Sequence, residues 1–392
     1  MKENSILLLT NTYPDFKSSY RGVFIEGLAS LLQADGYQIS VVTPKIYSRS
    51  RYFEQQNGVN VYRFPFLARN KLLIEYKKIP YLRMILYYIS GFFLTLYVTL
   101  KRHCDVIHVH WAIPTGLIGV WVGTLMRKPL YVTIHGSDFR MAMDNSLILH
   151  KLLLWVCKRA RHITCVSETI RRELERQNIA SQKLSVIPMG VGENFLKVGR
   201  DREKDLDNRT YTVLSNRNLQ PIYNVSLLVR AIPFVVRKEP RIRFLIAGDG
   251  PKREDLEKEV KDLDVCSCVA FLGKIPHDEM PGLLAKTDIY VSTSLCDGTS
   301  VSLLEAMASG AFPIVTDIPS NREWIKDGDN GFLIPVTKER LLAEKILEII
   351  GNQKLFEKSF QKNLSIVTEK ALLAANLNKM KGIYTEILAG SS

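Results

Sequence analysis

Short apolar runs rich in Val and Ile recur along this chain, and stretches with helical spacing separate them. Most of these runs do not alternate with polar residues, which is typical of parallel strands that helices cover on both faces. The first half contains such runs at 6–9, 39–43, 59–64, 106–110, 130–134, 162–166 and 185–187. The second half contains them at 212–215, 242–247, 269–272, 289–292, 312–316 and 331–334. The alternation predicts an α/β fold built from doubly wound parallel sheets.

A polar, charge-dense stretch at 199–209 interrupts this pattern. It indicates a boundary between two domains, which we place at 1–200 and 201–375, and we expect a last helix at 376–392 to cross back to the first domain. The length of 392 residues agrees with two or three domains of ordinary size. Two Rossmann-like domains facing each other would form a cleft at the carboxyl ends of their strands, where such sheets bind ligands.

The net charge of +13 belongs to the first half of the chain. Residues 1–200 hold 27 of the 53 basic side chains and 13 of the 40 acidic ones. A basic half can face nucleic acid, an anionic membrane or an anionic substrate. Nucleic acid is the weakest of these three, because no helix-turn-helix spacing, zinc finger or RNP-type aromatic motif accompanies the charge.

The six cysteines form no CxxC pair and show no zinc-binding spacing with histidine. No signal peptide precedes the first apolar run. We therefore expect a cytoplasmic protein with free thiols and without a structural metal.

Two acidic residues, Asp297 and Glu305, stand eight positions apart where an apolar run leads through a Gly-containing turn into a helix. Main-chain N–H groups at the start of a helix are unpaired and carry the positive end of its dipole. A phosphorylated ligand held there would lie between two carboxylates, which suits the hydroxyl groups of a sugar nucleotide. The local pattern alone favours the alternative, a capping box in which Ser302 and Glu305 stabilise the helix start.

Other polar residues directly follow predicted strands. His135 opens the sequence HGSD after the fifth run, and Arg217 follows the first run of the second half. Gly22 stands where the loop after the first run leads into a helix, and the absence of a side chain there permits close approach of a ligand. Gly248 and Gly250 do not form a GxGxxG fingerprint, so a dinucleotide site has no support.

The order of motifs along nearly the whole chain resembles the GT-B glycosyltransferases of family 4, which are retaining, metal-independent enzymes that use nucleotide-sugar donors. These motifs are RGVFIEGLASLL, HGSD, VIPMGV, AGDGPKREDLE, VAFLGKIPHDEMPGLLAKTDIYVSTS and DGTSVSLLEAMASGAFPIVTDIPSNREWIKDGDNGFLIP. The resemblance implies a GT-B fold and sugar transfer from a nucleotide donor, without a metal or another cofactor.

The resemblance also implies roles for individual residues. His135 would lie near the reacting sugar, Arg217 would bind the diphosphate, and Asp297 would contact the transferred sugar; these three are the expected catalytic residues. Glu305 would bind the ribose and Ile275 the nucleobase. The other expected residues of the nucleotide-sugar site are Gly22, Gly298, Thr299, Ser300, Val301 and Arg322. For His135 the alternative is a packed imidazole with satisfied hydrogen bonds at a strand end.

The chain departs from the family pattern at two places. Ile222 and Tyr223 stand where the family usually has a second phosphate-binding cation, a Lys about five residues after the Arg. Asp297 stands where Glu is commoner, which shortens the reach of the carboxylate by one methylene. We hypothesise that Arg322 supplies part of the lost charge; the alternative is a solvated surface Arg.

Residues 71–102 form an apolar and aromatic stretch with basic flanks. Its apolar core at 84–100 is at the lower limit of length for crossing a bilayer, and its tyrosines give it an interfacial character. Since the stretch lies between two strands of one sheet, we expect a domain helix whose basic flank contacts anionic lipid. The alternative is a wholly buried core helix.

Together these features predict a retaining hexosyltransferase that acts on a glycan or lipid-linked acceptor at the cytoplasmic face of a membrane, as in the assembly of cell-surface polysaccharide or glycolipid. Two rival functions stay open. A nucleotide-sugar epimerase would share the architecture, although the motifs of the second half match the transferases more closely. A catalytically weakened scaffold subunit that binds a sugar nucleotide would explain the missing Lys.

Overall fold

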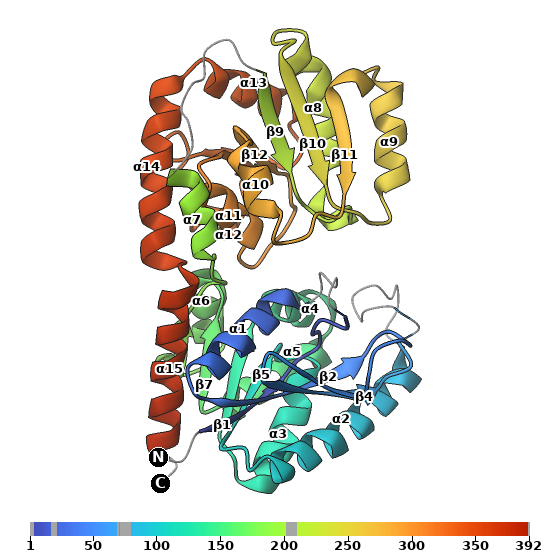
Figure 1. Ribbon diagram of the computed structural model, residues 1–392, viewed down its shortest axis with the longest axis vertical. Coiled ribbons are helices and arrows are strands. Elements are labelled where there is room, and N and C mark those ends of the chain that lie inside the picture. The colour runs from blue at the N-terminus through green and yellow to red at the C-terminus, as the bar shows by residue number, and fades with distance from the viewer. Residues whose placement is uncertain (1–3, 17–21, 69, 71–79, 201–209, 391–392) are drawn as a thin grey trace. The chain divides into compact units, whose positions relative to one another are not determined.

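The chain folds into two compact units, each an α/β domain around one mainly parallel sheet (Figure 1). The computed structural model describes residues 4–16, 22–68, 70, 80–200 and 210–390. Unit 1 consists of Met1–Ile187 and Leu377–Ser392, and unit 2 consists of Pro188–Asn376. The predicted pair of doubly wound domains is therefore confirmed.

Unit 1 contains an eight-stranded sheet in the order β3-β4-β2-β1-β5-β6-β7-β8. Its strands are β1 (Ser5–Leu9), β2 (Gln38–Lys45), β3 (Phe53–Gln56), β4 (Val59–Pro65), β5 (Val106–His110), β6 (Leu130–Ile134), β7 (His162–Cys165) and β8 (Leu184–Val186). Its helices are α1 (Val23–Ala34), α2 (Tyr81–Lys101), α3 (Thr115–Met126), α4 (Ser137–Asn145), α5 (Leu147–Arg159), α6 (Glu168–Arg176) and the larger part of α15 (Leu373–Ala389).

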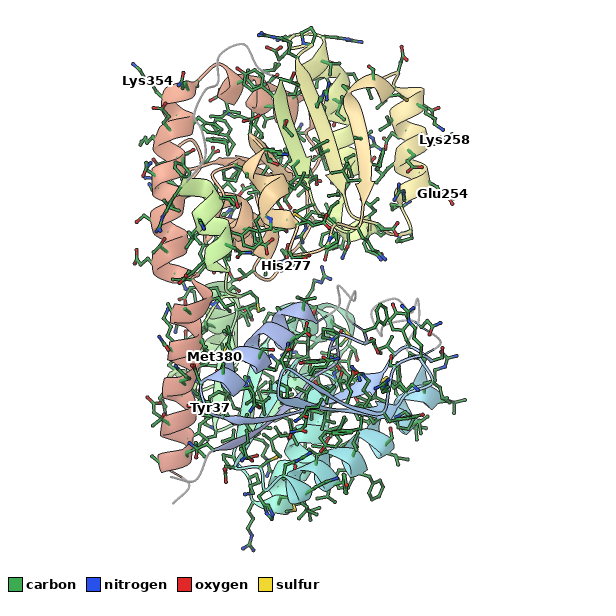
Figure 2. All side chains as sticks on the ribbon, viewed as in Figure 1. Tyr37, Glu254, Lys258, His277, Lys354 and Met380 are labelled. Atoms are coloured by element: carbon green, nitrogen blue, oxygen red, sulfur yellow. The ribbon has the colours of Figure 1, made fainter. Side chains whose placement is uncertain are left out.

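Helices cover both faces of this sheet. On one face, side chains of β1, β2 and β5 form a buried cluster with α1 and with Ile383 and Tyr384 of α15. Met380 and Tyr37, labelled in Figure 2, pack against the same cluster. On the other face α3 approaches β5 closely, since a Cβ at Gly119 would lie 2.4 Å from Val109 Cγ2.

Strand β3 is the strand that the apolar pattern does not predict. It pairs antiparallel with β4 at the edge of the sheet, and its sequence FEQQ has no buried side chain. Because it buries no face, it leaves no apolar run in the sequence. The other described strands lie within two residues of their predicted bounds.

Unit 2 contains a six-stranded parallel sheet in the order β11-β10-β9-β12-β13-β14. Its strands are β9 (Tyr211–Ser215), β10 (Ile242–Ala247), β11 (Val269–Gly273), β12 (Ile289–Ser292), β13 (Phe312–Thr316) and β14 (Phe332–Ile334). Its helices are α7 (Glu193–Arg200), α8 (Ser226–Val236), α9 (Arg253–Asp262), α10 (Met280–Ala285), α11 (Val301–Ala308), α12 (Pro319–Arg322), α13 (Glu339–Ile350) and α14 (Gln353–Lys370). One buried cluster joins the sheet to α8, α9 and α13, and a second joins it to α7, α10, α11 and α14.

The boundary between the units differs from the predicted one. The sequence places it after residue 200, whereas the structure divides the chain after Ile187, so that α7 belongs to unit 2. Helix α7 buries Phe195 and Leu196 among side chains of α10 and α11, and a Cβ at Gly199 would lie 2.2 Å from the carbonyl oxygen of Ala308. The predicted linker from 201 onwards lies outside the described residues. The packing of α7 against unit 2 explains why the boundary lies before this helix rather than after it.

Among the described residues, α2 is the one helix long and apolar enough, by length and composition, to cross a membrane. It packs on β2, β4 and α3 and buries Tyr87, Thr95 and Val98. Its other side is exposed, and 28% of its most apolar window is buried. The alternative of a wholly buried core helix is therefore wrong. The basic residues expected before this helix, Lys71, Lys77 and Lys78, lie outside the described residues.

Candidate active site

In unit 2, β9 and β12 lie side by side at the point where the strand order changes direction. The chain leaves these two neighbouring strands in opposite directions, which opens a crevice beyond their carboxyl ends, the usual place for a ligand in such a sheet. Arg217 follows β9, and the turn that contains Asp297 follows β12. The topology thus brings together two residues that are eighty positions apart in the sequence.

The guanidinium of Arg217 is buried and held by several partners. Its Nη1 donates to Ser300 Oγ and Ser302 Oγ, both at 2.8 Å. Its Nη2 donates to Asp297 Oδ2 at 2.5 Å, and the ring of Tyr223 lies 4.3 Å from the guanidinium carbon. Two predicted site residues therefore form a salt bridge, which the sequence did not foresee.

Hydrogen bonds between loops fix this arrangement. Thr293 Oγ1 donates to the carbonyl oxygens of Tyr223 and Asn224, and the main chain of Leu295 donates to that of Ile222. These contacts tie the loop after β9 to the loop after β12. They place the aromatic ring of Tyr223 where the family pattern would put a Lys.

Polar atoms without a partner surround the same point. Ser215 Oγ, Asn216 Oδ1 and Arg217 Nε are buried, and none has a hydrogen-bond partner within the described part of the chain. Buried polar groups are rarely left unpaired in folded proteins, because each costs about 1–3 kcal/mol. A group of them at a switch point indicates a place where a polar ligand completes the hydrogen bonding.

Glu305 lies in the second turn of α11, where it is 5% exposed. Burial raises the pKa of its carboxyl to about 8. The nearest basic group is His277, labelled in Figure 2, whose Nδ1 lies 3.7 Å from Glu305 Oε1. Glu305 is thus a buried acid that is mainly protonated at neutral pH.

The alternative of a capping box at Ser302 and Glu305 is wrong. The N-cap of α11 is Ser300, whose side chain accepts a hydrogen bond from Leu303 N at 3.3 Å. Counted from this cap, Glu305 stands too far along the helix to reach the first free main-chain N–H groups. The helix start thus does not account for this acid.

The remaining predicted residues of unit 2 occupy different surroundings. Asp297 Oδ1 accepts a hydrogen bond from Gly298 N at 3.0 Å, and Thr299 is buried beside it. Ile275 follows β11 and packs against the cluster that includes α11, whose first residue is Val301. These positions all follow the carboxyl ends of β11 and β12 in the chain.

Arg322 does not join this group. It stands at the end of α12 with its side chain 60% exposed, and its Nε and Nη2 donate to the two carboxylate oxygens of Asp317 at 2.5 and 2.9 Å. One edge of its guanidinium is thereby occupied by a bidentate ion pair. The structure fits the alternative of a surface Arg, and the charge proposed to replace the family Lys is already paired.

Unit 1 has its own switch point between β1 and β5. Gly22 precedes α1 with φ +70, and a Cβ there would lie 2.8 Å from the carbonyl oxygen of Thr12 in the loop after β1. A side chain at position 22 would therefore strain the backbone and displace that loop. The turn at Gly22 brings the start of α1 against the loop at the carboxyl end of β1.

His135 follows the neighbouring strand β6 and is half-buried. Its Nε2 lies 3.0 Å from His110 Nδ1, and its ring is 4.3 Å from that of Trp111. Asp138 accepts hydrogen bonds from the main chain of His135 at 3.1 Å and of Ala112 at 2.7 Å, which orders the HGSD turn. Desolvation lowers the pKa of His135 to about 3, so its imidazole is neutral.

The sequence reasoning missed His108 and His110. The sequence His-Val-His in β5 places both rings on one face of the sheet, a signal that period-two alternation could have supplied. His108 is hydrogen-bonded to Tyr384 Oη at 2.6 Å and to Thr133 Oγ1 at 2.8 Å. His110 is 1% exposed, and its Nε2 has no partner among the described residues.

No group of three or more His, Cys, Asp or Glu side chains that could hold a metal occurs in the part of the chain that the structure describes. All six cysteines are free.

Comparison with known proteins gives a match for each half of the chain. Residues 22–194 match the family described as Glycosyltransferase Family 4, and residues 200–365 match the family described as Glycosyl transferases group 1. The two matches together cover most of the chain and place one family description on each half.

Two curated relatives illustrate the range of similar proteins. The gpi3 subunit of phosphatidylinositol N-acetylglucosaminyltransferase from Schizosaccharomyces pombe is 26% identical over 318 residues, which are 80% of this chain and 66% of that protein. The alpha-monoglucosyldiacylglycerol synthase of Streptococcus pneumoniae is 24% identical over 375 residues, which are 87% of this chain and 81% of that protein. The chain thus spans about two thirds of the first relative and most of the second.

Solved structures resemble the whole chain. Sucrose-phosphate synthase from Thermosynechococcus elongatus matches with a TM-score of 0.78 at 16% identity, covering 99% of this chain and 100% of that one. Anabaena HepE in complex with UDP and glucose matches with a TM-score of 0.74 at 15% identity, covering 97% of this chain and 99% of that one. At such identities the likeness concerns the fold.

Proposed function

Because the chain belongs to the family 4, group 1 glycosyltransferases and has their GT-B fold, we propose that it is a retaining hexosyltransferase. It moves a sugar from a nucleotide donor to a membrane-associated glycolipid or polysaccharide acceptor. One observation carries this proposal: the buried Arg217 lies at the switch point of unit 2, beside the start of α11 and against Asp297. A cation in a dry crevice stabilises the negative charge that develops on a leaving diphosphate.

The salt bridge between Arg217 and Asp297 is the resting arrangement of this site. The diphosphate of the nucleotide donor takes the place of the Asp297 carboxylate on Arg217 Nη2, while Ser300 and Ser302 keep Nη1 in position. The released carboxylate then accepts a hydrogen bond from a hydroxyl of the transferred sugar. The exchange keeps Arg217 paired with an anion in both states, which avoids an unpaired buried charge.

The rest of the nucleotide occupies the residues around this pair. Main-chain N–H groups from Gly298 to Val301 and the positive end of α11 add to phosphate binding. The ribose hydroxyls donate to Glu305, and the base lies against Ile275.

His135 serves the acceptor side as a neutral hydrogen-bonding group. His110 orients it, since the two rings share a hydrogen bond of 3.0 Å. If His110 Nδ1–H donates to His135 Nε2, then His135 presents Nδ1–H to the sugar, and the unpaired Nε2 of His110 is only a free acceptor. The opposite tautomer would bury an unpaired N–H, which costs more.

Retention follows from front-face substitution, in which the leaving diphosphate takes the proton of the acceptor hydroxyl. The bond from the anomeric carbon to the phosphate oxygen breaks, and the bond to the acceptor oxygen forms on the same face. No enzyme nucleophile and no metal enters this scheme. Arg217 bears the charge that the leaving group gains.

We place the enzyme at the cytoplasmic face of a membrane, held there by α2. Its outer side exposes a stripe of apolar residues at helical spacing: Leu82, Ile85, Ile89, Phe93 and Leu100. Lys101 and Arg102 follow at its end and suit anionic headgroups. The names of both curated relatives refer to lipids, which favours an acceptor at a membrane surface.

A second candidate is a sugar-nucleotide-binding scaffold subunit with little activity of its own. The observation that favours it is Tyr223, which stacks on Arg217 where a second cation would be expected. Such a protein would bind the nucleotide sugar but turn it over slowly.

A thermal-shift screen of the purified protein against UDP-, GDP-, ADP- and TDP-sugars identifies the nucleotide donor, because a ligand of the folded state raises Tm by mass action. Transfer is then measured on glycolipid acceptors in vesicles, and the anomeric configuration of the product is determined by NMR. An inverted product would overturn the retaining mechanism. A Tm increase without transfer or hydrolysis, in wild type and Asp297→Asn alike, would favour the scaffold subunit.

A further inference from the structure

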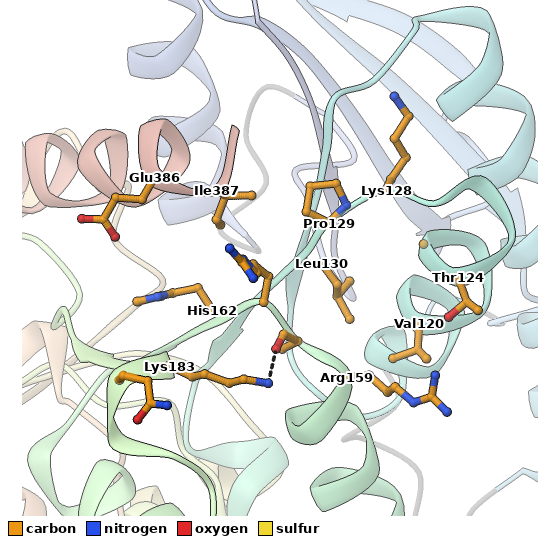
Figure 3. Close-up of a pocket in the computed structure, with 14 residues that line it drawn as sticks. Val120, Thr124, Lys128, Pro129, Leu130, Arg159, His162, Lys183, Glu386 and Ile387 are labelled. Carbon is orange, nitrogen blue, oxygen red and sulfur yellow. Dashed lines mark hydrogen bonds between the residues drawn. The ribbon is translucent and has the colours of Figure 1, made fainter. Parts of the chain in front are cut away.

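A cavity of about 640 Å³ lies in unit 1 at the amino ends of β6, β7 and β8 (Figure 3). Leu130 and His162 open β6 and β7, and Lys183 directly precedes β8. His110 is the last residue of β5 and His135 directly follows β6, so the cavity lies at the opposite edge of the sheet from them. It is therefore separate from the switch point of this unit.

The charged residues of the cavity lining are mainly basic. Lys128, Arg159, Arg161 and Lys183 line it, whereas Glu386 is the one acid among its described lining residues. None of these basic side chains forms an ion pair in the part of the chain that the structure describes. Like charges around one hollow repel each other, and a bound anion would relieve that repulsion.

Helix dipoles explain only part of this charge. Lys183 Nζ donates to the carbonyl oxygen of Lys158 at 3.2 Å and to that of Ala160 at 3.1 Å, which satisfies the end of α5; Figure 3 shows the second of these bonds. A cation at a helix C-terminus contributes about 0.3–1 kcal/mol in this way. Arg161 lies beyond α5 and Lys128 beyond α3. Because neither side chain is ion-paired among the described residues, both charges are available to a ligand.

The walls between these cations are apolar. Val120, Pro129, Leu130 and Ile387 contribute them, and the volume is that of a small-molecule site rather than of a single ion. Guanidinium groups prefer phosphate, which they bind through two parallel hydrogen bonds. A phosphate ester attached to a larger organic group fits both the charge and the size.

We propose that this cavity is a second anion-binding site, which takes a phosphorylated ligand of the size of a sugar phosphate or a phospholipid headgroup. The phosphate pairs with basic side chains of the lining, and the organic part lies against Pro129 and Ile387. The site is independent of the nucleotide donor site and does not depend on the proposed transfer reaction.

His162 gives the site a spectroscopic readout. Its Nε2 is hydrogen-bonded to Ser185 Oγ at 2.9 Å, and it lines the cavity with Glu386. Burial lowers the pKa of His162, an effect that Glu386 opposes. A bound phosphate adds a stronger negative charge than Glu386 alone, so the pKa of His162 rises on binding.

The test titrates the full chain with glycerol 3-phosphate and glucose 6-phosphate and follows the imidazole signals of His162 by NMR. We expect saturable shifts, a higher pKa of His162, and the same affinity in Arg217→Gln, which removes the phosphate-binding cation of the other site. Arg159→Gln/Arg161→Gln lowers the affinity about tenfold or more. The matched control Lys151→Gln/Arg172→Gln removes the same charge outside the cavity and leaves the affinity within about twofold.

Vesicles distinguish the two sources of the phosphate. Phosphatidic acid vesicles that compete with glycerol 3-phosphate for wild type, and bind Arg159→Gln/Arg161→Gln less well than the control double variant, indicate a lipid headgroup. Binding of the soluble phosphates without competition by vesicles indicates a free metabolite. The proposal is overturned if His162 does not respond up to about 10 mM ligand, or if both double variants lose affinity equally.

Discussion

The two units share a strand order around their switch points, yet they place opposite kinds of chemistry there. In unit 2 the crevice holds a charged pair, Arg217 and Asp297, whose ions are 2.5 Å apart. In unit 1 it holds neutral imidazoles, because desolvation keeps the pKa of His110 and His135 far below the usual range. The topology thus decides where a ligand can bind, while burial and pairing decide whether the site offers charge or only hydrogen bonds.

This contrast suits a reaction between a charged donor and an uncharged acceptor. In the proposed reaction the diphosphate needs a cation, and Arg217, a side chain that stays charged, is held in place by Asp297 in the resting site. An acceptor hydroxyl needs a partner of fixed orientation, which His110 ensures for His135. Variants that change the charge of one crevice or the hydrogen bonding of the other test this assignment directly.

The largest effect is expected for Arg217→Lys, which keeps the charge but removes the planar fork. Lysine cannot reach Ser300, Ser302 and Asp297 at once, so kcat/KM should fall about 10²–10³-fold, as for other lost charge-stabilising donors. Steady-state transfer kinetics measure this effect. Arg230→Lys is the control, since Arg230 is an exposed residue paired with Glu259. Activity of Arg217→Lys within threefold of wild type would remove Arg217 from the mechanism.

The second effect concerns the protonation of Glu305. Its carboxyl has a pKa of about 8 because it is buried, so it carries a proton at pH 7. If the ribose hydroxyls donate to the carboxylate, binding of the nucleotide sugar releases this proton, and affinity rises about tenfold per pH unit up to about pH 8. Calorimetry in two buffers of different ionisation enthalpy measures the release. A pH-independent affinity in wild type would contradict the ribose role.

Glu305→Gln separates this binding effect from stability. The folded protein holds the proton of Glu305 up to about pH 8, whereas the unfolded chain loses it near 4.5, the ordinary pKa of a glutamate carboxyl. The free energy of unfolding therefore falls as pH rises from about 4.5 to about 8. The Gln variant avoids this loss, so its Tm should exceed that of wild type at pH 8 but not at pH 4, and its nucleotide affinity should no longer depend on pH.

A smaller effect, about tenfold on kcat, is expected for His110→Leu. The change removes the hydrogen bond to His135 and lets both tautomers form, while the affinity for the nucleotide should not change. Long-range ¹⁵N NMR of His135 reports the tautomer directly, and His110→Asn should restore part of kcat because its amide N–H can replace Nδ1–H. A single unchanged tautomer in His110→Leu would show that His110 does not orient this ring.

The sequence predicted where these residues would lie but not how they would pair. Apolar runs located β9 and β12 closely, because a strand buried on both faces leaves a continuous signal. The salt bridge between Arg217 and Asp297 depends on side-chain conformations in two turns and on the order of strands in the sheet. Neither is encoded in local periodicity, so the two residues were assigned to separate parts of the ligand.

At two other places the structure differs from the sequence-based prediction for the same reason. Ser300 and Ser302 both fit the sequence signature of a helix cap, and only the backbone geometry shows that Ser300 is the cap. Arg322 was expected to compensate for a missing cation, but Asp317, five positions earlier in the chain, binds it. Local sequence names candidates for a polar contact, and the tertiary structure selects among them.

The smallest effect, and the one that tests the contrast most closely, is expected for Tyr223→Lys. The Tyr223 ring lies 4.3 Å from the guanidinium of Arg217, so a Lys there would place a second cation beside it. Without ligand the two charges repel and Tm should fall, whereas a nucleoside diphosphate should bind about three- to tenfold more tightly because it pairs with both.

Tyr223→Phe is the matched control, since it keeps the stacked ring and adds no charge. If Tyr223→Lys binds the diphosphate no better than Tyr223→Phe, the diphosphate does not lie against this part of the loop. Arg217 would then serve only to hold Asp297 and the start of α11. The salt bridge between Arg217 and Asp297 would in that case have a structural role only. The difference between a charged crevice in unit 2 and a neutral one in unit 1 would then not reflect the chemistry of the donor and the acceptor.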